Sequence, residues 1–375
     1  MVYKILEIIP QVHANETPNI GGFKLHTIDQ DNAKLVDLTI NQRRNTVTAS
    51  KEIHLTSRPK GVPAQDNFEI VSTDIAAPGD GDVLVKNIYM SVDPYMRGRM
   101  RMSPVGEVLT GGAVGKVVSS NHPEFVAGDY VSSDQGWREF YLSNGENLTK
   151  IDATIAPLST YLGVMGMPGL TAYGGLLVTG ELKDGETVFV SAATGAVGSV
   201  VGQIAKTKGC RVIGSAGSDD KVKQLIEEYG FDHAFNYKTA NPLAELRQGA
   251  PDGIDVYFEN VGGEQLEAAL THMRPFGRIP ICGMIAHYND DGTPTPGPKN
   301  LMETIYKFLT LKGFVVTAFQ DLKPTFEKDM AAWINSGQVK YHETVLDGID
   351  NAPNAFIGLF DGSNNGKMLV KLADD

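Results

Sequence analysis

Cysteine is nearly absent from this chain, since Cys210 and Cys282 are the two cysteines among 375 residues. Two cysteines cannot build a disulfide framework or a zinc lobe held by four thiolates, and so low a count is typical of a reducing compartment. Apolar runs of the roughly 20 residues that cross a bilayer are also missing. Glu7 and Pro10 interrupt the uncharged core that a signal peptide would need. We therefore expect a cytoplasmic protein that does not associate with membranes.

Positive charge is scarce as well, because 45 acidic residues outnumber 33 lysines and arginines and give a formal net charge of -12. Such a chain repels phosphate backbones, and no basic run is interleaved with aromatic residues, so we expect no nucleic-acid partner. The sequence also lacks G-x-S-x-G, a P-loop and H-E-x-x-H. These absences argue against a serine hydrolase of that type, a P-loop NTPase and a zinc peptidase.

The pattern of short segments changes twice along the chain, which predicts one domain inserted into another. Residues 49–164 contain strand-like runs such as FEIV and DVLVKNIYM between turn-rich pieces, as in an antiparallel β domain. Residues 165–318 alternate strands and helices, which indicates a parallel, doubly wound sheet. Residues 319–375 begin with a long amphipathic helix and return to short strands. The predicted fold class is α/β, with a β domain interrupted by a doubly wound domain.

The segment at 189–206 reads FVSAATGAVGSVVGQIAK, and it resembles a dinucleotide-binding turn without its first glycine. Ala193, Gly195 and Gly198 occupy the three positions of G-x-G-x-x-G. Alanine permits the turn as long as its φ is negative. The alternative is an ordinary strand-to-helix turn, but a position after a strand and before a helix favours dinucleotide binding.

The end of the next strand, RVIGSA, indicates which dinucleotide is bound. An NAD site places Asp or Glu there for the ribose 2′-hydroxyl, whereas this chain has small neutral residues at 215–218. Lys221 follows and can pair with a 2′-phosphate. The alternative is that Ser218 only caps a helix and Lys221 is solvated. The composition favours NADP(H) over NAD.

Hydride transfer with a nicotinamide needs a group that polarises the oxygen of the acceptor, either a metal ion or a hydrogen-bond donor. A catalytic zinc would need cysteine or histidine ligands at suitable spacing, and the predicted β domain contains no cysteine, so we predict no metal site. Tyr95 and Tyr288, near predicted strand ends, are candidate hydroxyl donors. The alternative for each is a packing tyrosine with a satisfied hydroxyl.

Eight collinear motifs from about residue 52 to the C-terminus carry a family resemblance. They are VDPYMRGRM, GVMGMPGLTAYGGL, AATGAVGS, GSAGSDDK, FNYK, YFENVGGE, GRIPICGMIAHYN and NNGKMLVKL. They resemble the zinc-independent medium-chain dehydrogenase/reductases, in the group of leukotriene B4 12-hydroxydehydrogenase, prostaglandin reductase, alkenal double-bond reductase and curcumin reductase. The resemblance implies a GroES-like catalytic domain, a Rossmann domain, NADPH, and reduction of the C=C bond of a hydrophobic enone or enal. It also implies a homodimer.

The resemblance further implies the residues of the site. Tyr95 and Tyr288 match the tyrosines associated with the substrate carbonyl. The residues that match cofactor-contacting positions are Thr194, Gly195, Ala196, Val197, Gly198, Ser218, Lys221, Tyr237, Asn260, Cys282, Gly283, Tyr288, Phe314, Val315, Val316 and Asn364.

Two segments depart from the family pattern. The stretch between Met100 and Gly111 is shorter than usual, and residues 1–48 form an N-terminal extension of unknown role, with strand-like runs at 4–9 and 34–40. Two other functions stay open at this point. One is an NADPH:quinone oxidoreductase, and the other is a non-catalytic NADPH-binding protein such as a sensor.

Overall fold

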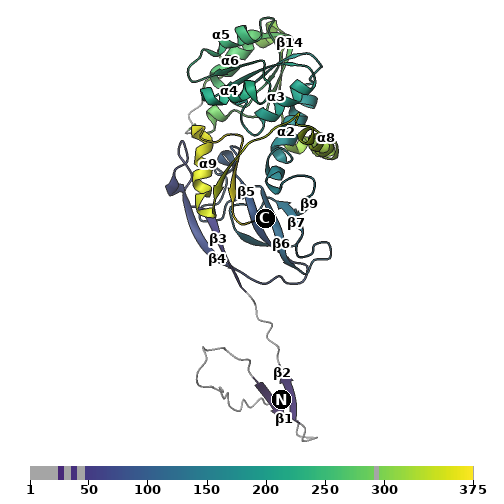
Figure 1. Ribbon diagram of the computed structural model, residues 1–375. Helices are drawn as coiled ribbons and strands as arrows, with labels where there is room; N and C mark the ends of the chain where they lie inside the picture. Colours follow the sequence, from purple (N-terminus) through teal and green to yellow (C-terminus); the bar gives the residue numbers. More distant parts are fainter. Residues whose placement is uncertain (1–23, 29–34, 40–46, 291–294, 375) are drawn as a thin grey trace. The chain divides into compact units, whose positions relative to one another are not determined.

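The computed structural model describes residues 24–28, 35–39, 47–290 and 295–374. The chain divides into two units, Met1–Val47 and Thr48–Asp375. In the first, β1 (Lys24–Ile28) pairs antiparallel with β2 (Leu35–Thr39). β2 confirms the second strand predicted in the extension, whereas the first predicted strand lies outside the described residues. All other described elements belong to the second unit (Figure 1).

A six-stranded parallel sheet within the described residues confirms the doubly wound domain. Its strands, in spatial order, are β12 (His233–Asn236), β11 (Arg211–Ala216), β10 (Thr187–Val190), β13 (Ile254–Phe258), β14 (Met273–Ile281) and β15 (Thr310–Gly313). Val188 and Val190 pack into the core on one face, and Phe189 packs into the core on the other. Burial on both faces explains why this strand is apolar without interruption.

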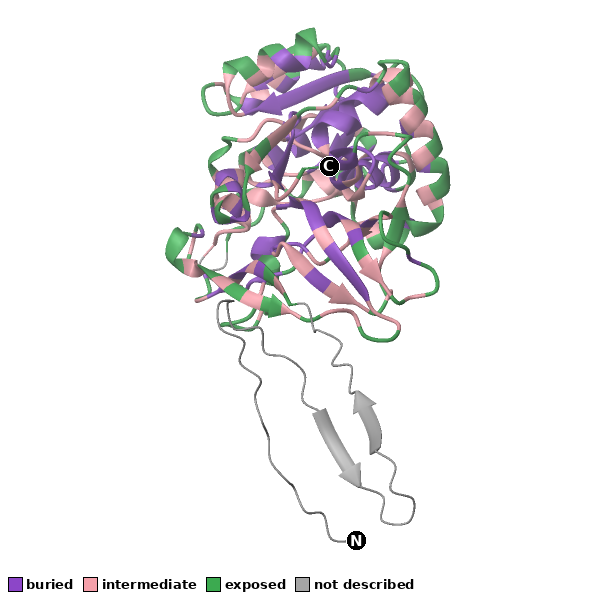
Figure 2. Cartoon of the chain, turned by 60° about the horizontal axis from the view of Figure 1, so that its bottom comes forward, coloured by how far each residue is buried: buried purple, intermediate pink, exposed green. Residues whose placement is uncertain are grey.

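Helices and the segments that connect them supply further core residues on both faces of this sheet, and Figure 2 shows buried residues along its strands. The helices that follow or precede its strands are α2 (Met167–Gly174), α3 (Gly198–Thr207), α4 (Asp219–Glu227), α5 (Pro242–Gly249), α6 (Gly263–His272), α7 (Glu303–Tyr306) and α8 (Lys323–Asn335). One prediction was wrong in extent. The apolar run LTLKGFVV at 309–316 predicts one strand, but the strand ends at Gly313, and Val316–Leu322 forms a 3-10 helix instead.

A second sheet of seven strands, counted within the described residues, contains elements from both ends of the second unit. Its strands are β16 (Glu343–Asp347), β17 (Lys367–Lys371), β5 (Val83–Ser91), β6 (Ala113–Ser120), β7 (Tyr130–Ser133), β9 (Thr149–Ile151) and β8 (Phe140–Ser143), the last paired with β5. β17 pairs antiparallel with β5, so the C-terminal segment completes a sheet begun before the parallel one. β16 and β17, the two short strands of the C-terminal segment, pair in parallel.

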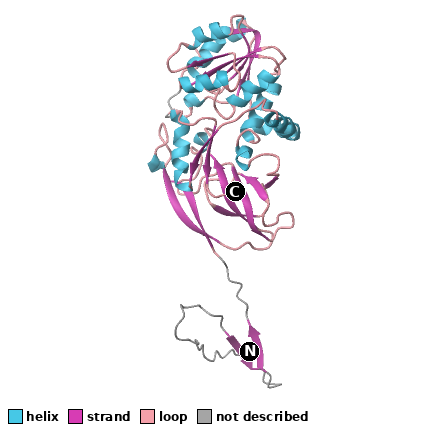
Figure 3. Cartoon of the chain, in the orientation of Figure 1, coloured by secondary structure: helices cyan, strands magenta, loops and turns pink. Residues whose placement is uncertain are grey.

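Smaller elements complete the strand-rich part of the second unit (Figure 3). They are the antiparallel pair β3 (Thr48–Leu55) and β4 (Phe68–Ile75), and the helices α1 (Met96–Arg99) and α9 (Ala352–Asp361). The sequence analysis missed α9, although Pro353 in its first turn and Gly362 after its end, with φ 80°, are ordinary start and stop signals. No helix of the described residues is long and apolar enough to cross a membrane.

The two sheets meet at Gly366, directly before β17. Its amide donates to Thr194 O at 3.1 Å, and it forms a parallel bridge with Gly195 in the turn after β10. Gly366 has φ 68°, and a Cβ there would lie 1.9 Å from His342 O. Only glycine fits this backbone, so the closeness of the two sheets depends on it.

We predict that Gly366→Ala destabilises the protein more than Gly337→Ala does. Both glycines have positive φ, but a Cβ at Gly337 would meet nothing within 4 Å. Alanine in a left-handed conformation costs about 1 to 2 kcal/mol at either site, and the clash adds about 1 to 3 kcal/mol at Gly366. Urea denaturation of the two variants measures the difference. Equal losses of unfolding free energy would show that the backbone at Gly366 relaxes freely.

Candidate functional site

The carboxyl ends of β10 and β13 lie side by side where the strand order of the parallel sheet reverses. In doubly wound sheets dinucleotides bind in this crevice. Asn260 joins the two strand ends, since its Nδ2 donates to Ser191 O at 2.8 Å and its backbone amide donates to Ser191 Oγ at 2.9 Å. The structure therefore places Asn260, a residue predicted from the family resemblance, at the crevice.

The turn after β10 is tight because of Gly198 and Ala192. A Cβ at Gly198 would lie 2.4 Å from Ala192 O, so α3 approaches the strand this closely only with glycine. The left-handed conformation is taken by Ala192, with φ 50°, and not by Ala193. The first position of the glycine motif thus needs no positive φ, which explains why alanine serves there.

The start of α3 offers backbone donors to a ligand. The first hydrogen bond of the helix runs from the Ser199 amide to Gly195 O at 3.0 Å. The amides of residues 196–198 donate to none of the residues that the structure describes. Unsatisfied amides at a helix start carry a partial positive charge and bind pyrophosphate. The predicted turn from Thr194 to Gly198 therefore fits that group.

Two lysines and a tyrosine gather around Gly217, after the end of β11. A Cβ at Gly217 would lie 3.3 Å from Tyr237 Oη and 3.4 Å from Lys238 Cε. Burial, and then the charge of Lys238, lowers the pKa of Lys221. Ser218 caps α4 by accepting a hydrogen bond from the Lys221 amide at 3.4 Å. Two neighbouring ammonium groups suit an anion with two negative charges, such as a 2′-phosphate.

Lys221 also reaches the C-terminal segment. Its Nζ donates to Gly362 O and to Asn364 O, each at 2.7 Å. An ammonium has three N–H donors, so one is left for a ligand. The side chain of Asn364 donates to Gly366 O at 2.9 Å. This predicted residue therefore contacts Lys221 through its backbone carbonyl, while its side chain bonds within the C-terminal loop.

The segments of the two predicted tyrosines lie against each other through two arginines. Arg97 is 2% exposed, and its Nε donates to Asn289 Oδ1 at 3.1 Å. Arg101 Nη2 donates to Asp290 O at 3.3 Å. Arg97 is in α1 and Arg101 stands two residues beyond its end, while their partners come immediately after Tyr288. Arg101 opens the short loop noted in the sequence, so this loop borders the site.

The hydroxyl of Tyr95 has no hydrogen-bond partner among the described residues. The residue is 37% exposed, with the Arg99 guanidinium 4.9 Å from its ring centroid. Burial of the hydroxyl end, and then the charge of Asp93, raises the pKa of Tyr95 to about 12. The phenol therefore stays protonated at neutral pH and is free to donate.

The hydroxyl of Tyr288 is turned back onto its own segment. Its Oη accepts a hydrogen bond from the Met284 amide at 3.4 Å, and a Cβ at Gly283 would lie 2.8 Å from it. Burial raises the pKa of Tyr288, although the Met284 amide acts in the opposite direction. The phenol accepts one bond and keeps its own proton to donate.

A buried ion pair fixes the turn before Tyr95. Lys367 Nζ donates to Val92 O and to Asp93 Oδ1, each at 2.8 Å, and the paired side chains are 5% and 8% exposed. Ser91 Oγ donates to the other carboxylate oxygen of Asp93. Breaking one partner of such a pair costs about 3 to 5 kcal/mol. The first residue of β17 thereby holds the segment of a candidate catalytic tyrosine.

The remaining predicted cofactor residues are packed to different degrees. Phe314 is half-buried, with its ring centroid 5.9 Å from that of Phe258, and Val316 is half-buried in the same core, whereas Val315 is 67% exposed. Cys282 is half-buried, and burial, followed by the charge of Glu259, raises its pKa to about 12. Contact of these side chains with a cofactor stays a prediction.

Four residues of this region escaped the sequence analysis. Lys238 directly follows Tyr237 in the motif FNYK, and a second cation beside a predicted phosphate ligand was a usable signal. Glu259 stands in YFENVGGE at the end of a strand, which is also a usable signal. The sequence offered no signal for Arg97 or Lys367, because the hydrogen-bond partners discussed above are far away from them in the chain.

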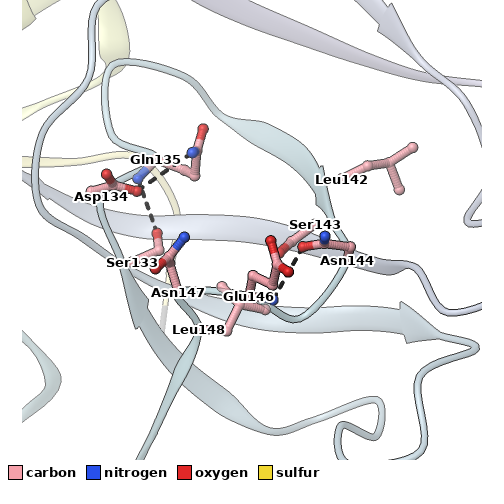
Figure 4. Close-up of a pocket in the computed structure, with 9 residues that line it drawn as sticks. All are labelled: Ser133, Asp134, Gln135, Leu142, Ser143, Asn144, Glu146, Asn147 and Leu148. Atoms are coloured by element: carbon pink, nitrogen blue, oxygen red, sulfur yellow. Dashed lines mark hydrogen bonds between the residues drawn. The ribbon is translucent and has the colours of Figure 1, made fainter.

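A polar cavity of about 320 Å³ lies elsewhere, next to the ends of β7 and β8. Figure 4 shows Asp134 and Gln135 on one side of it and Asn144 and Glu146 on another. None of the predicted site residues lines it. Its carboxylates do not suit a hydrophobic substrate, so it does not enter the candidate site.

Two family models match the chain. The first, described as the N-terminal domain of oxidoreductase, matches residues 51–151. The second, described as zinc-binding dehydrogenase, matches residues 196–336. The described residues do not fit zinc, because no group of three or more histidine, cysteine, aspartate or glutamate side chains among them is placed to hold a metal ion.

Curated relatives are similar over most of their length. The NADPH-dependent curcumin reductase of Escherichia coli is 42% identical over 86% of this chain and 96% of that protein. Prostaglandin reductase 1 of Bos taurus is 47% identical over 83% of this chain and 95% of its own. The NADP(+)-dependent 2-alkenal reductase of Nicotiana tabacum is 44% identical over 87% of this chain and 98% of that protein.

Solved structures share the fold. CurA from Vibrio vulnificus in complex with NADPH superposes with a TM-score of 0.82 at 41% identity, covering 87% of this chain and all (100%) of that one. Escherichia coli quinone oxidoreductase complexed with NADPH has a TM-score of 0.69 at 19% identity, covering 86% and 100%, which shows a common fold and nothing more.

Proposed function

Because the chain belongs to the medium-chain dehydrogenase/reductase family, in the group of curcumin, prostaglandin and 2-alkenal reductases, we propose that it is an NADPH-dependent reductase of C=C bonds conjugated to a carbonyl. The observation that carries the proposal is the pair of tyrosines. Burial raises the pKa of both Tyr95 and Tyr288, and their segments are joined beside the dinucleotide crevice by a half-buried hydrogen bond from Arg97 and an exposed one from Arg101.

The residues present fit NADPH at three places. The open amides before α3 fit the pyrophosphate, the Lys221, Tyr237 and Lys238 group fits the 2′-phosphate, and Asn260 stands where the nicotinamide end of the crevice is expected. When bound, NADPH supplies a hydride. The protein's part is to hold the substrate so that its β-carbon receives the hydride, and to stabilise what forms on its oxygen.

The tyrosines supply that stabilisation. Addition of hydride to the β-carbon places negative charge on the carbonyl oxygen as an enolate, and hydrogen bonds from Tyr288 and Tyr95 lower the energy of that charge. A phenol whose pKa lies well above neutral pH donates a hydrogen bond without being ionised itself. The enolate then takes a proton at its α-carbon. Half-buried Met284 and Phe314 give an apolar border that suits a hydrophobic enone or enal.

We predict that the protein oxidises NADPH when it is given a long-chain enone or enal, and that it does so faster than with a simple quinone. Loss of NADPH absorbance in steady-state assays, with mass spectrometry of the saturated product, measures both rates. Tyr288→Phe should lower kcat/KM for the enone about a hundredfold, since one oxyanion donor is worth about 10² to 10³.

Faster turnover of the quinone would favour an NADPH:quinone oxidoreductase. Tight NADPH binding with a raised melting temperature, yet no turnover of any acceptor, would favour a non-catalytic binding protein.

We predict that Lys221→Ala raises the KM for NADPH about 10- to 100-fold, because a charge-assisted bond to phosphate is worth about 1.5 to 3 kcal/mol. The KM for NADH, which has no 2′-phosphate, should change far less. Lys223→Ala is the matched control, since Lys223 is in the same helix, is 69% exposed and pairs with Glu227 at 3.8 Å. An equal change for both cofactors would remove Lys221 from the 2′-phosphate site.

We also propose that the protein is a homodimer formed at the β15 edge of the parallel sheet. Phe276 and Phe308 are 68% and 64% exposed, and their rings stack at 5.1 Å between centroids. Both have positive φ, 65° and 52°, which is rare for bulky residues. Ile305 and Tyr306, each 68% exposed, extend the patch. Exposed apolar side chains beside a strand edge are typical of an interface.

The two free cysteines fit the cytoplasm as the compartment of the protein, and cell fractionation tests this part of the proposal.

For the dimer, we expect sedimentation equilibrium to give twice the chain mass at micromolar concentration, and Phe276→Ser with Phe308→Ser to give monomers. A monomeric parent protein under these conditions would contradict the proposal. Val126→Ser, which removes a 61% exposed apolar residue elsewhere, should leave the mass unchanged.

A further inference from the structure

Glu259 is a fully buried acid at the crevice where the strand order reverses. It directly follows β13, and its exposed fraction is 0%. A carboxylate in such a place loses its hydration, and protein interiors accept this only with strong hydrogen bonds. Nothing in the proposed hydride transfer uses this residue directly, so its presence needs another reason.

One oxygen of Glu259 collects donors from both strand ends. Oε1 accepts from Tyr257 Oη at 2.8 Å, Ser191 Oγ at 3.1 Å, the Val261 amide at 2.6 Å and the Gly262 amide at 2.9 Å. Two of these donors are the backbone amides of the turn that follows. Glu259 therefore fixes the conformation of residues 259–262 from inside, as an N-cap does for a helix start.

The other oxygen, Oε2, is buried without a hydrogen-bond partner among the described residues. An unpaired buried acceptor destabilises the folded protein, because it loses its hydrogen bonds to water and gains none in return. A neutral residue of the same size would avoid the burial of a charge. The acid is thus costly for stability in this position, which points to a role in the site.

The carbonyls of the 259–262 turn hold the segment that leads to Tyr288. Each bond runs from a backbone amide of residues 282–286 to a carbonyl of the turn. The bonds are Cys282 N to Glu259 O at 2.9 Å, Gly283 N to Glu259 O at 3.1 Å, Ile285 N to Asn260 O at 3.1 Å and Ala286 N to Val261 O at 3.0 Å. Whatever sets the turn therefore also sets the Met284 amide and, through it, the Tyr288 hydroxyl.

We propose that Glu259 is a positioning residue of the reductase: it holds the 259–262 turn, and through that turn the segment that carries the oxygen-binding Tyr288. Burial is the main cause of the raised pKa of Tyr288, and the charges of Cys282 and then Glu259 add to it. The proposal rests on the proposed function as far as its kinetic effect is concerned. Its structural part stands independently of the substrate.

Glu259→Gln tests the proposal, since it keeps the shape and one acceptor but removes the charge. Hydrogen exchange of the full-length chain without cofactor or substrate should show faster exchange of the amides in residues 282–286. In the assay, kcat for the enone should fall about tenfold, as misplacement of a catalytic group does, while the KM for NADPH changes less than about twofold. A double-mutant cycle with Tyr288→Phe should be non-additive, because both changes remove the same contribution.

The matched control is Glu186→Gln. Glu186 is 15% exposed, pairs with Arg278 at 2.5 Å and accepts from the Lys183 amide at 2.8 Å, near the opposite end of the parallel sheet. The Glu186→Gln variant should be less stable than the parent protein. Its amide exchange rates in residues 282–286 and its kcat should equal those of the parent protein. If Glu259→Gln does not fold, Glu259→Asp, which keeps the charge, takes its place, with a smaller effect expected in the same direction.

Parent exchange rates in residues 282–286, or additive effects with Tyr288→Phe, would overturn the proposal and reduce Glu259 to a structural residue. If instead the parent protein reduces no enone, the proposed function fails while the exchange result still decides whether Glu259 sets the segment.

Discussion

The buried charge of Lys367 constrains how the two sheets come together. Its partners Val92 O and Asp93 are 275 and 274 residues away in the chain. An ammonium can leave water at this depth only when both partners are in place, so β17 has to pair with β5 for the charge to be compensated. The preceding residue, Gly366, pairs at the same time with the turn that follows β10. Two adjacent residues thus couple the nucleotide turn to the segment of Tyr95.

Removal of water also affects the two candidate hydroxyl donors. Burial is the main cause of the raised pKa at both Tyr95 and Tyr288. Nearby charges add to the effect, that of Asp93 for Tyr95 and those of Cys282 and then Glu259 for Tyr288. In the proposed reaction, neutral donors of this kind would act where charge on a substrate oxygen is poorly solvated and therefore benefits most from each hydrogen bond.

The sequence predicted the parts of this arrangement that depend on local pattern. The bounds of β11 and the helices α3, α4 and α8 follow from apolar periodicity and glycine positions. Lys221 and Tyr237 lie near the end of β11, and a 2′-phosphate site there stays a prediction. α9 was missed although its signals were present. Arg97 and Lys367 were beyond reach for a physical reason. Each is defined by partners in distant segments, 192 and 274 residues away in two of the bonds, and no local spacing encodes such a pairing.

The thiol of Cys282 has a consequence for the lifetime of such an enzyme. Enones and enals are electrophiles that alkylate thiolates, and a reactive cysteine bordering the crevice would be consumed by the molecules it helps to process. Burial, followed by the charge of Glu259, raises the pKa of Cys282 to about 12, so the thiol stays protonated at neutral pH, and the thiolate is the nucleophile. Desolvation of this one sulfur therefore lowers its reactivity toward the electrophiles that the proposed reaction would bring to the crevice.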